Sequence, residues 1–238
     1  MFSRRFVCVG GVGALVAGLP GCAGQDILPG IATSPETTST IPVANLTRTI
    51  SRPDYKAVYN DYPGERFPIA AFDHDQVDPV YLRQSVEFKR AEQPGSIVID
   101  PSSRHLYYVE SPGVATRYGV GVGREGFLWS GSAHIQMKRD WPDWVPPREM
   151  VERQPEIREK LEPTPRGLGV RGGPKSPLGA RAMYLWGDGH DLGYRIHGTT
   201  EPETIGTNVS SGCIRMVNQD IAHLYARVSI GTPVTVLG

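Results

Sequence analysis

Glycine and proline interrupt this chain at short intervals, and this limits the length of any regular helix. The 238 residues include 28 glycines and 21 prolines, together more than a fifth of the sequence. Proline removes a backbone hydrogen-bond donor and glycine favours tight turns, so the pattern predicts short strands joined by turns rather than a bundle of long helices. We therefore expect a mostly β fold.

Short runs rich in β-branched and aromatic residues begin near residue 95. Residues 96–100 and 104–110 predict two strands, because a turn-forming Asp-Pro-Ser-Ser sequence lies between them. We predict further strands at residues 115–123, 131–138, 182–186, 194–197 and 232–237.

Only two stretches have a helical pattern. Residues 218–228 carry apolar side chains at helical spacing, and Asn218 is suited to cap the first turn. Residues 147–161 predict two short helical segments, because Pro155 divides them. These features predict a compact, mostly β domain at residues 95–238, with one C-terminal helix and few short helices.

The N-terminus has the pattern of an export signal. Arg4 and Arg5 precede an uncharged, glycine-rich apolar run that ends near Pro20. A membrane-spanning anchor is disfavoured, because a span needs ~20 strongly apolar residues and the glycines weaken this one. We assign residues 1–22 to a signal peptide. The general and the twin-arginine export routes both stay open.

Cys22 follows Leu-Pro-Gly, a sequence similar to the cleavage box of bacterial lipoproteins. Two hypotheses stay open: Cys22 is acylated and anchors the protein to a membrane, or it is an ordinary residue near the cleavage site. In both cases we expect an exported protein of the periplasm or cell envelope.

The segment between the signal and the compact domain changes character near residue 54. Residues 31–53 contain 12 Ser, Thr or Pro in 23 positions, so we predict a flexible linker at residues 23–53. Aromatic residues then reappear among prolines and charges. We expect residues 54–94 to form an irregular segment that packs against the compact domain.

The charge balance and the motifs argue against nucleic acid, nucleotide and metal partners. Lys and Arg number 25, as do Asp and Glu, and no basic patch stands out. Residues 121–126 match G-x-G-x-x-G, but no helix is predicted after them, so we expect no dinucleotide cofactor. The chain lacks H-E-x-x-H and C-x-x-C motifs, so we expect no metal. The candidate ligands would be Asp188, His190, His197 and Cys213.

The residues that carry chemistry lie between positions 194 and 218. His197 ends a predicted strand, and Cys213 is the one cysteine of the predicted domain. A thiol near its ordinary pKa of ~8.5 is little ionised at neutral pH, and a neighbouring imidazole can accept its proton. Gly212 allows a tight turn and close substrate approach. The alternative is a buried structural thiol and a hydrogen-bonded core histidine.

The whole motif resembles a known family. His197-Gly-Thr, then Ile205-Gly206, then the string from Ser210 to Met216 (SSGCIRM) resemble the signature of the L,D-transpeptidase catalytic domain, the YkuD family, especially its ErfK/YbiS-like branch. Residues 141–150 and 172–183 are also similar to that branch. The resemblance covers about residues 95–238 and implies a β-sandwich-type domain.

The resemblance implies an envelope enzyme that acts on peptidoglycan stem peptides. Cys213 is then the nucleophile and His197 its base, oriented by a main-chain carbonyl that we assign to Gly198. Gly212 and Ser211 are expected to support the oxyanion through backbone N–H groups. Arg215 is expected to bind stem-peptide carboxylates, and the alternative is a salt bridge that holds its loop.

Several functional alternatives stay open. The implied reaction cleaves the bond between diaminopimelate and the terminal D-Ala of a tetrapeptide. The acyl group then passes to a second diaminopimelate amine, giving a 3–3 crosslink, or to a lysine of an envelope protein. Hydrolysis, as in an L,D-carboxypeptidase or an amidase that releases wall proteins, is the first alternative. A noncatalytic wall-binding lipoprotein is the second. The sequence also leaves open whether residues 140–168 form a lid.

Overall fold

The computed structural model describes residues 48–124, 129–210 and 212–238. The predicted signal at 1–22, the acylation candidate Cys22, residues 23–47 of the linker, and Ser211 lie outside the described residues. No helix in the described part of the chain combines the length and apolar character that crossing a membrane requires.

The fold is built on one ten-stranded sheet, and the prediction of a mostly β domain is confirmed. The strand order is β1-β2-β5-β4-β3-β14-β7-β10-β11-β13. These strands are β1 (Thr49–Ser51), β2 (Gln84–Glu87), β3 (Ile97–Asp100), β4 (His105–Ser111), β5 (Val114–Gly119), β7 (Gly131–Asp140), β10 (Arg181–Gly187), β11 (His190–His197), β13 (Ile214–Arg215) and β14 (Pro233–Val236). Two small sheets pair β6 (Val122–Gly123) with β12 (Asn208–Ser210) and β8 (Glu162–Thr164) with β9 (Gly167–Gly169).

Helices in the described residues are few and short. They are α1 (Tyr55–Val58), α2 (Arg148–Arg153) and α3 (Asn218–Arg227), with 3₁₀ turns at His74–Gln76, Pro79–Tyr81, Pro155–Lys160 and Pro202–Thr204. The predicted break at Pro155 is confirmed, because α2 ends at Arg153 and a 3₁₀ turn begins at Pro155.

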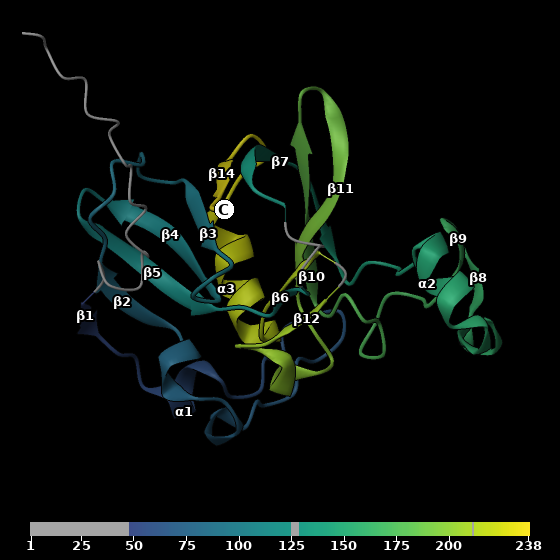
Figure 1. Cartoon of the computed structure of the whole chain (residues 1–238). Helices are drawn as coiled ribbons and strands as arrows, with labels where there is room; N and C mark the ends of the chain where they lie inside the picture. Colours follow the sequence, from purple (N-terminus) through teal and green to yellow (C-terminus); the bar gives the residue numbers. More distant parts are fainter. Residues whose placement is uncertain (1–47, 125–128, 211) are drawn as a thin grey trace, which may run out of the picture. The chain divides into compact units, whose positions relative to one another are not determined.

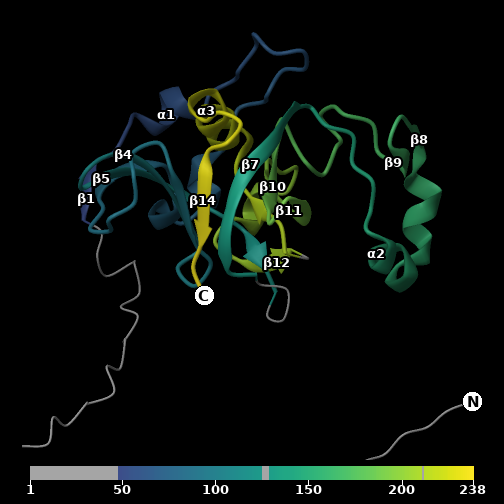
Figure 2. The ribbon, with the colours of Figure 1, turned by 90° about the horizontal axis from the view of Figure 1, so that it is seen from above.

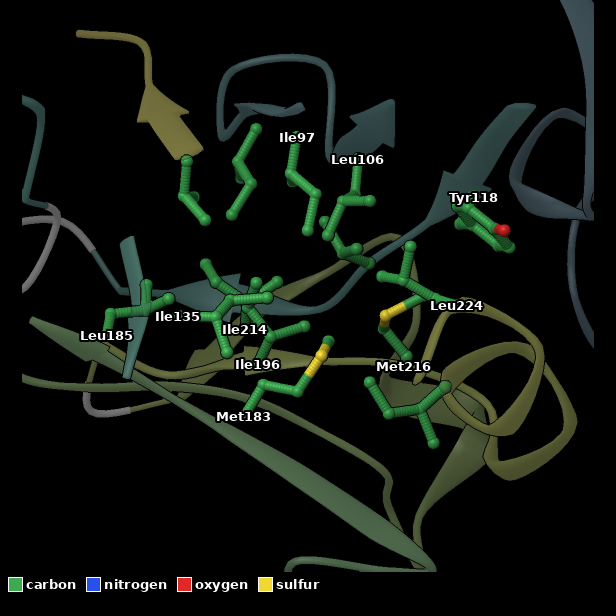
Figure 3. Close-up of a cluster of buried hydrophobic side chains, with 14 of the residues drawn as sticks. Ile97, Leu106, Tyr118, Ile135, Met183, Leu185, Ile196, Ile214, Met216 and Leu224 are labelled. Carbon is green, nitrogen blue, oxygen red and sulfur yellow. The ribbon is translucent and has the colours of Figure 1, made fainter. Parts of the chain in front are cut away.

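The main core lies between the two halves of the sheet. Helix α3 lies between the half that contains β3, β4 and β5 and the half that contains β7, β10 and β11 (Figure 1). Figure 3 shows Ile97 and Leu106 from one half above Met183 and Ile196 from the other, with Leu224 of α3 beside them. Almost all residues of strands β3 and β10 are buried. Their sequences are therefore nearly continuous apolar runs.

The prediction that Asn218 caps α3 is wrong. Val217 is the N-cap residue, and no side chain caps this helix. The Asn218 amide instead accepts a hydrogen bond from the Ala180 N–H at 2.9 Å and donates one to the Thr199 carbonyl oxygen at 2.8 Å. The Asn218 side chain therefore connects the loop before β10 to the loop after β11. It does not cap the helix, although its local propensity predicts a cap.

The segment before the compact domain is more regular than its sequence predicts. Strand β1, at the end of the predicted linker, pairs with β2, and β2 pairs with β5. Residues 54–94 thus carry β2, the strand next to the edge strand β1, as well as α1 and two 3₁₀ turns. Asp54, Asp73 and Asp78 each accept a backbone hydrogen bond at the start of one of these short turns.

A long excursion leaves the sheet between β7 and β10. It contains α2, the 3₁₀ turn at Pro155–Lys160, and the hairpin of β8 and β9. Figures 1 and 2 show these elements grouped to one side of the sheet, joined to it by extended connections. Residues of this excursion form one wall of the cavities described next.

Candidate active site

The pairing of two strands brings the histidine and the cysteine of the motif together. Strands β11 and β13 are parallel, with Ile196 opposite Ile214 and His197 opposite Arg215. The Met216 N–H donates to the His197 carbonyl oxygen at 2.8 Å, which fixes this register. Cys213 lies just before β13, so the same register places it opposite the strand residues that lead to His197.

Three of the predicted site residues line one cavity. His197, Cys213 and Arg215 contribute to a cavity of about 410 Å³ whose other wall comes from the excursion. Gly212 is buried beside Cys213 and has a φ of 112°, a left-handed conformation that favours glycine. Ser211, predicted to support the oxyanion, lies outside the described residues.

The ring of His197 is held in one orientation. Its Nδ1 atom lies 2.6 Å from the carbonyl oxygen of Gly198, the residue to which the sequence analysis assigns this contact. A carbonyl oxygen only accepts hydrogen bonds, so Nδ1 carries the proton. In the neutral ring Nε2 is therefore the atom that can accept a proton.

The environment of His197 favours the neutral imidazole. Burial lowers the pKa of His197 to about 4, the Gly198 hydrogen bond opposes that shift, and the Arg215 and Arg195 charges add to it. The residue is 5% exposed, so little water reaches the ring to stabilise an imidazolium. The histidine is thus uncharged at neutral pH and available as a base.

The Cys213 thiol is also neutral at rest. Burial raises its pKa, whereas a hydrogen bond from the Arg195 backbone N–H and the charges of Arg195 and Arg215 act in the opposite direction. Because burial favours the neutral form of both partners, we expect proton transfer from the thiol to accompany attack on a substrate rather than to precede it.

Arg215 is held by an ion pair at the cavity wall. Its Nη1 atom lies 2.8 Å from Glu201 Oε2, and this contact connects β13 to the loop that follows His197. The salt bridge offered as an alternative for this residue is therefore present. Because the side chain also lines the cavity, binding of a substrate carboxylate stays a prediction.

Arg195 is a site residue that the sequence analysis missed. Its guanidinium donates to both carboxylate oxygens of Asp191 at 2.7 Å and lies 4.3 Å from the ring centroid of Tyr184. In a regular strand Asp191 and Arg195 would point to the same face but lie about 13 Å apart. The register shift between β10 and β11 at this point shortens that separation. The one available signal was its position two residues before His197, on the same strand face.

Asn218 explains why a glycine follows the histidine. A Cβ atom on Gly198 would lie 2.2 Å from Asn218 Oδ1, which is too close for any real contact. The Asn218 amide holds the Ala180 N–H and the Thr199 carbonyl on either side of this glycine. The carbonyl that orients His197 is thereby fixed through α3.

The residues considered for a metal site are not gathered at one point. Among the residues that the structure describes, no group of three or more His, Cys, Asp or Glu side chains is arranged to hold a metal ion. The glycine motif also contributes to the strand framework, because Gly121 exchanges backbone hydrogen bonds with Arg215 at 3.0 and 2.8 Å. Gly126 of that motif lies outside the described residues.

A family model described as the L,D-transpeptidase catalytic domain, YkuD, matches residues 94–236. The chain belongs to this family. The resemblance noted from the motif is thereby confirmed. A family member of Escherichia coli (strain K12), the probable L,D-transpeptidase YbiS, is 31% identical over 144 residues, which are 59% of this chain and 43% of that protein. The probable L,D-transpeptidase ErfK/SrfK of Salmonella typhimurium has the same identity and coverage. The chain thus matches less than half the length of these relatives.

Solved structures with a similar domain include two bacterial proteins. A crystal structure from Brucella melitensis, described as a probable carnitine operon oxidoreductase, is 46% identical, with 69% of this chain and 99% of that chain covered and a TM-score of 0.46. An L,D-transpeptidase from Mycobacterium smegmatis is 18% identical, with 82% and 84% covered and a TM-score of 0.44.

Proposed function

We propose that this protein is a peptidoglycan L,D-transpeptidase in which Cys213 is the nucleophile and His197 is the general base and acid. The observation that carries the proposal is the placement of these two side chains, from paired strands of a YkuD-family domain, on the wall of one cavity. The proposed donor is a stem tetrapeptide, cleaved between diaminopimelate and the terminal D-Ala.

The acylation step uses the tautomer that Gly198 imposes. Nε2 of His197 takes the thiol proton as the Cys213 sulfur attacks the carbonyl carbon of the scissile bond. The tetrahedral oxyanion is proposed to accept hydrogen bonds from the backbone N–H groups of Gly212 and its neighbours, including Ser211. The C–N bond then breaks, His197 returns the proton to the D-Ala amine, and a thioester remains on Cys213.

The second step is the reverse reaction with a new amine. A diaminopimelate side-chain amine attacks the thioester carbonyl, transfers a proton to His197, and displaces the Cys213 thiolate, which recovers that proton. The product is a 3–3 crosslink. A lysine of an envelope protein in place of this amine would attach that protein to the wall, and water would give hydrolysis.

The site favours a catalytic role over a purely binding role. A noncatalytic wall-binding protein has no use for a thiol beside a histidine whose acceptor nitrogen is unprotonated. Hydrolysis needs no other residue, so transfer and hydrolysis are separated by product analysis.

We further propose that the protein is exported to the cell envelope, with Cys22 as its lipid anchor. Loss of membrane association in a Cys22→Ala variant would test the anchor.

Arg215 is proposed to bind a stem-peptide carboxylate in addition to holding Glu201. Glu201→Gln removes the ion pair and leaves the guanidinium, whereas Arg215→Gln removes both. If Arg215 binds substrate, only Arg215→Gln raises KM. If it serves the loop alone, the two variants have equal effects on kcat and KM.

Incubation of the purified protein with disaccharide-tetrapeptide, followed by mass spectrometry, tests the proposed reaction. Transpeptidation gives a dimer at the combined mass minus one D-Ala, and Cys213→Ala gives none. A tripeptide alone indicates hydrolysis or a missing protein acceptor, which a lysine-bearing envelope peptide then tests. Recovery of tetrapeptide alone from folded protein in both assays would contradict the proposal.

A further inference from the structure

A second cavity meets the first one at Cys213. It has a volume of about 200 Å³ and is lined on one side by Asp143, Arg166, Tyr184 and Arg195. The two cavities share the walls formed by Trp144, Pro147, Leu178, Gly193 and Cys213. His197 lines the first cavity and is not among the residues that line the second, whereas Cys213 lines both.

Tyr184 fixes two guanidinium groups in the second cavity. Arg166 Nη1 donates to the Tyr184 hydroxyl at 2.9 Å, and its guanidinium carbon lies 5.4 Å from the centroid of the same ring. Arg195 lies over this ring as well, but Asp191 neutralises it through two hydrogen bonds. Arg166 makes no close ion pair with any residue that the structure describes, although its charge also acts on Asp191. Its guanidinium can therefore pair directly with a ligand carboxylate.

Asp143 contributes the opposite charge to the same cavity. Its Oδ1 atom accepts a hydrogen bond from the Gly172 N–H at 2.7 Å, which holds the carboxylate in place. Within the described ranges Asp143 also has no ion-pair partner. A carboxylate and a guanidinium that do not neutralise each other in one cavity form a complementary pair for a ligand that carries both charges.

We propose that the second cavity binds the zwitterionic side-chain end of the donor's diaminopimelate, with its ammonium beside Asp143 and its carboxylate beside Arg166. This inference rests on the proposed function. His197 must give its proton to the leaving D-Ala amine, so the D-Ala half lies in the first cavity. The acyl half then crosses Cys213, and its side chain enters the second cavity along the apolar walls of Trp144 and Leu178.

The proposal makes Asp143 and Arg166 specificity-determining residues. A lysine at the third stem position has the terminal ammonium but lacks the carboxylate, and 2-aminopimelate has the carboxylate but lacks the ammonium. Each omission leaves one charged protein group without its partner. A charge-assisted hydrogen bond of this kind is worth about ten- to hundredfold in affinity.

Calorimetric binding to the Cys213→Ala protein tests the subsite without turnover. The probes are four tetrapeptides that differ at the third residue: diaminopimelate, diaminopimelate amidated at its side-chain carboxylate, lysine, and 2-aminopimelate. The diaminopimelate peptide is expected to bind about ten- to hundredfold more tightly than the other three. Adding Arg166→Gln should abolish the preference over the amidated and lysine peptides. Adding Asp143→Asn, which keeps the acceptor for Gly172, should abolish the preference over 2-aminopimelate.

Arg171→Gln is the matched control, because Arg171 is an exposed arginine of the same excursion that lines neither cavity. It should leave all four affinities unchanged. Equal affinities in the parent protein, a preference that survives Arg166→Gln, or no measurable binding of the diaminopimelate peptide would each overturn the proposal.

Turnover of the protein with Cys213 intact separates this inference from the proposed function. D-Ala release at the same kcat/KM from all four peptides would support the activity and overturn the subsite. An Arg166-dependent binding preference without any D-Ala release would support the subsite and contradict the activity.

Discussion

The proposed catalytic pair, His197 and Cys213, can be compared with a second buried cluster formed by Asp220, Tyr59 and Arg83. Both contain titratable groups whose pKa values are shifted by burial toward the neutral form. The Tyr59 hydroxyl donates to Asp220 Oδ2 at 3.0 Å, and Arg83 Nε lies 3.5 Å from Asp220 Oδ1. Judged by pKa alone, the two regions would be equal candidates for an active site.

The two regions differ in access. His197 and Cys213 line a cavity, whereas Asp220 and Tyr59 line neither of the two cavities that meet at Cys213. Arg83 borders a separate cavity, which Asp220 and Tyr59 do not line. Tyr59 belongs to an apolar cluster that also contains Val77, Leu82, Ile205 and Val217. A shifted pKa therefore reports desolvation in both regions, but only the cavity allows a substrate to reach the shifted group. We interpret the Asp220 cluster as the attachment of residues 54–94 to α3.

Variants of the catalytic pair should cause the largest loss of activity. Cys213→Ala removes the nucleophile, and His197→Asn keeps a donor for the Gly198 carbonyl while it removes the base. Each should lower D-Ala release by about 10³-fold or more. Urea unfolding of the Cys213→Ala protein should show a stability within about 1 kcal/mol of the parent. Residual release above a hundredth of the parent rate would contradict the assigned roles.

The Asp220 cluster should respond in the opposite way. Asp220→Ala leaves Arg83 and the Tyr59 hydroxyl buried without their partner, so the unfolding free energy should fall by about 3–4 kcal/mol. The kcat of the folded fraction should stay within about threefold of the parent, since the cluster does not touch substrate. Asp75→Asn, at an exposed carboxylate of the same segment, is the control. A folded Asp220→Ala protein without activity would contradict the interpretation that this cluster is structural and that only the region of His197 and Cys213 is catalytic.

The pH dependence of stability should carry the signature of Asp220. Burial raises the pKa of Asp220 to about 6, above its ordinary value, so the folded state binds this proton more tightly than the unfolded state. The contribution of Asp220 to the unfolding free energy should therefore fall by up to ~3 kcal/mol as the pH rises from about 4 to about 6, and this group contributes no further change above that range. His105, His197 and His223 act in the opposite direction, because burial lowers the pKa of each to about 4. Urea unfolding at several pH values measures the slope. Asp220→Asn cannot titrate at this position, so the difference in slope between the parent and this variant gives the Asp220 contribution; equal slopes in the two proteins would exclude Asp220 as a source.

The reactivity of Cys213 should report a neutral thiol. Because the pKa of Cys213 is raised and that of His197 is lowered, the thiolate fraction should grow about tenfold per pH unit through neutrality. Alkylation by iodoacetamide should then accelerate about hundredfold between pH 6 and pH 8. Mass spectrometry of the labelled protein follows the rate. A rate that is already constant across this range would indicate a thiolate–imidazolium pair at rest.

The smallest effect is expected at Asn218, which connects the two regions because it lies two residues before Asp220 in the first turn of α3. Asn218→Ala removes the hydrogen bonds to Ala180 and Thr199 and so loosens the Gly198 carbonyl that orients His197. We expect about a tenfold loss in kcat with little change in KM. Steady-state kinetics measure both. An unchanged kcat would show that the His197 ring needs no support from α3.

The sequence predicts well those elements whose pattern is local. Strand β3 is rich in β-branched residues, the centre of β4 is rich in aromatic residues, and β10 is a mostly apolar run. Helix α3 has a clear helical spacing of apolar residues. In these elements the local preference and the tertiary contacts agree. Strand β13 has two residues and exists because it pairs with β11. A strand of that length has no pattern to detect.

The residues of the candidate site also differ in whether the sequence predicts them. His197 and Cys213 are predictable because a thiol and an imidazole in one motif indicate a specific chemistry. Arg195 is not, because its approach to Asp191 depends on a register shift between β10 and β11. Asn218 was misassigned because its partners, Ala180 and Thr199, are distant in the sequence. Rules based on local sequence do not predict contacts between residues that only the tertiary structure brings together.

The most direct test of the account is the intact mass of the protein after brief exposure to tetrapeptide without an acceptor. The account predicts an added mass equal to the tetrapeptide minus D-Ala, located on Cys213 by peptide mapping and absent from Cys213→Ala. The His197→Asn protein should acylate far more slowly. An adduct on another residue, or D-Ala release that persists in Cys213→Ala, would contradict the claim that the reaction proceeds through a thioester on Cys213.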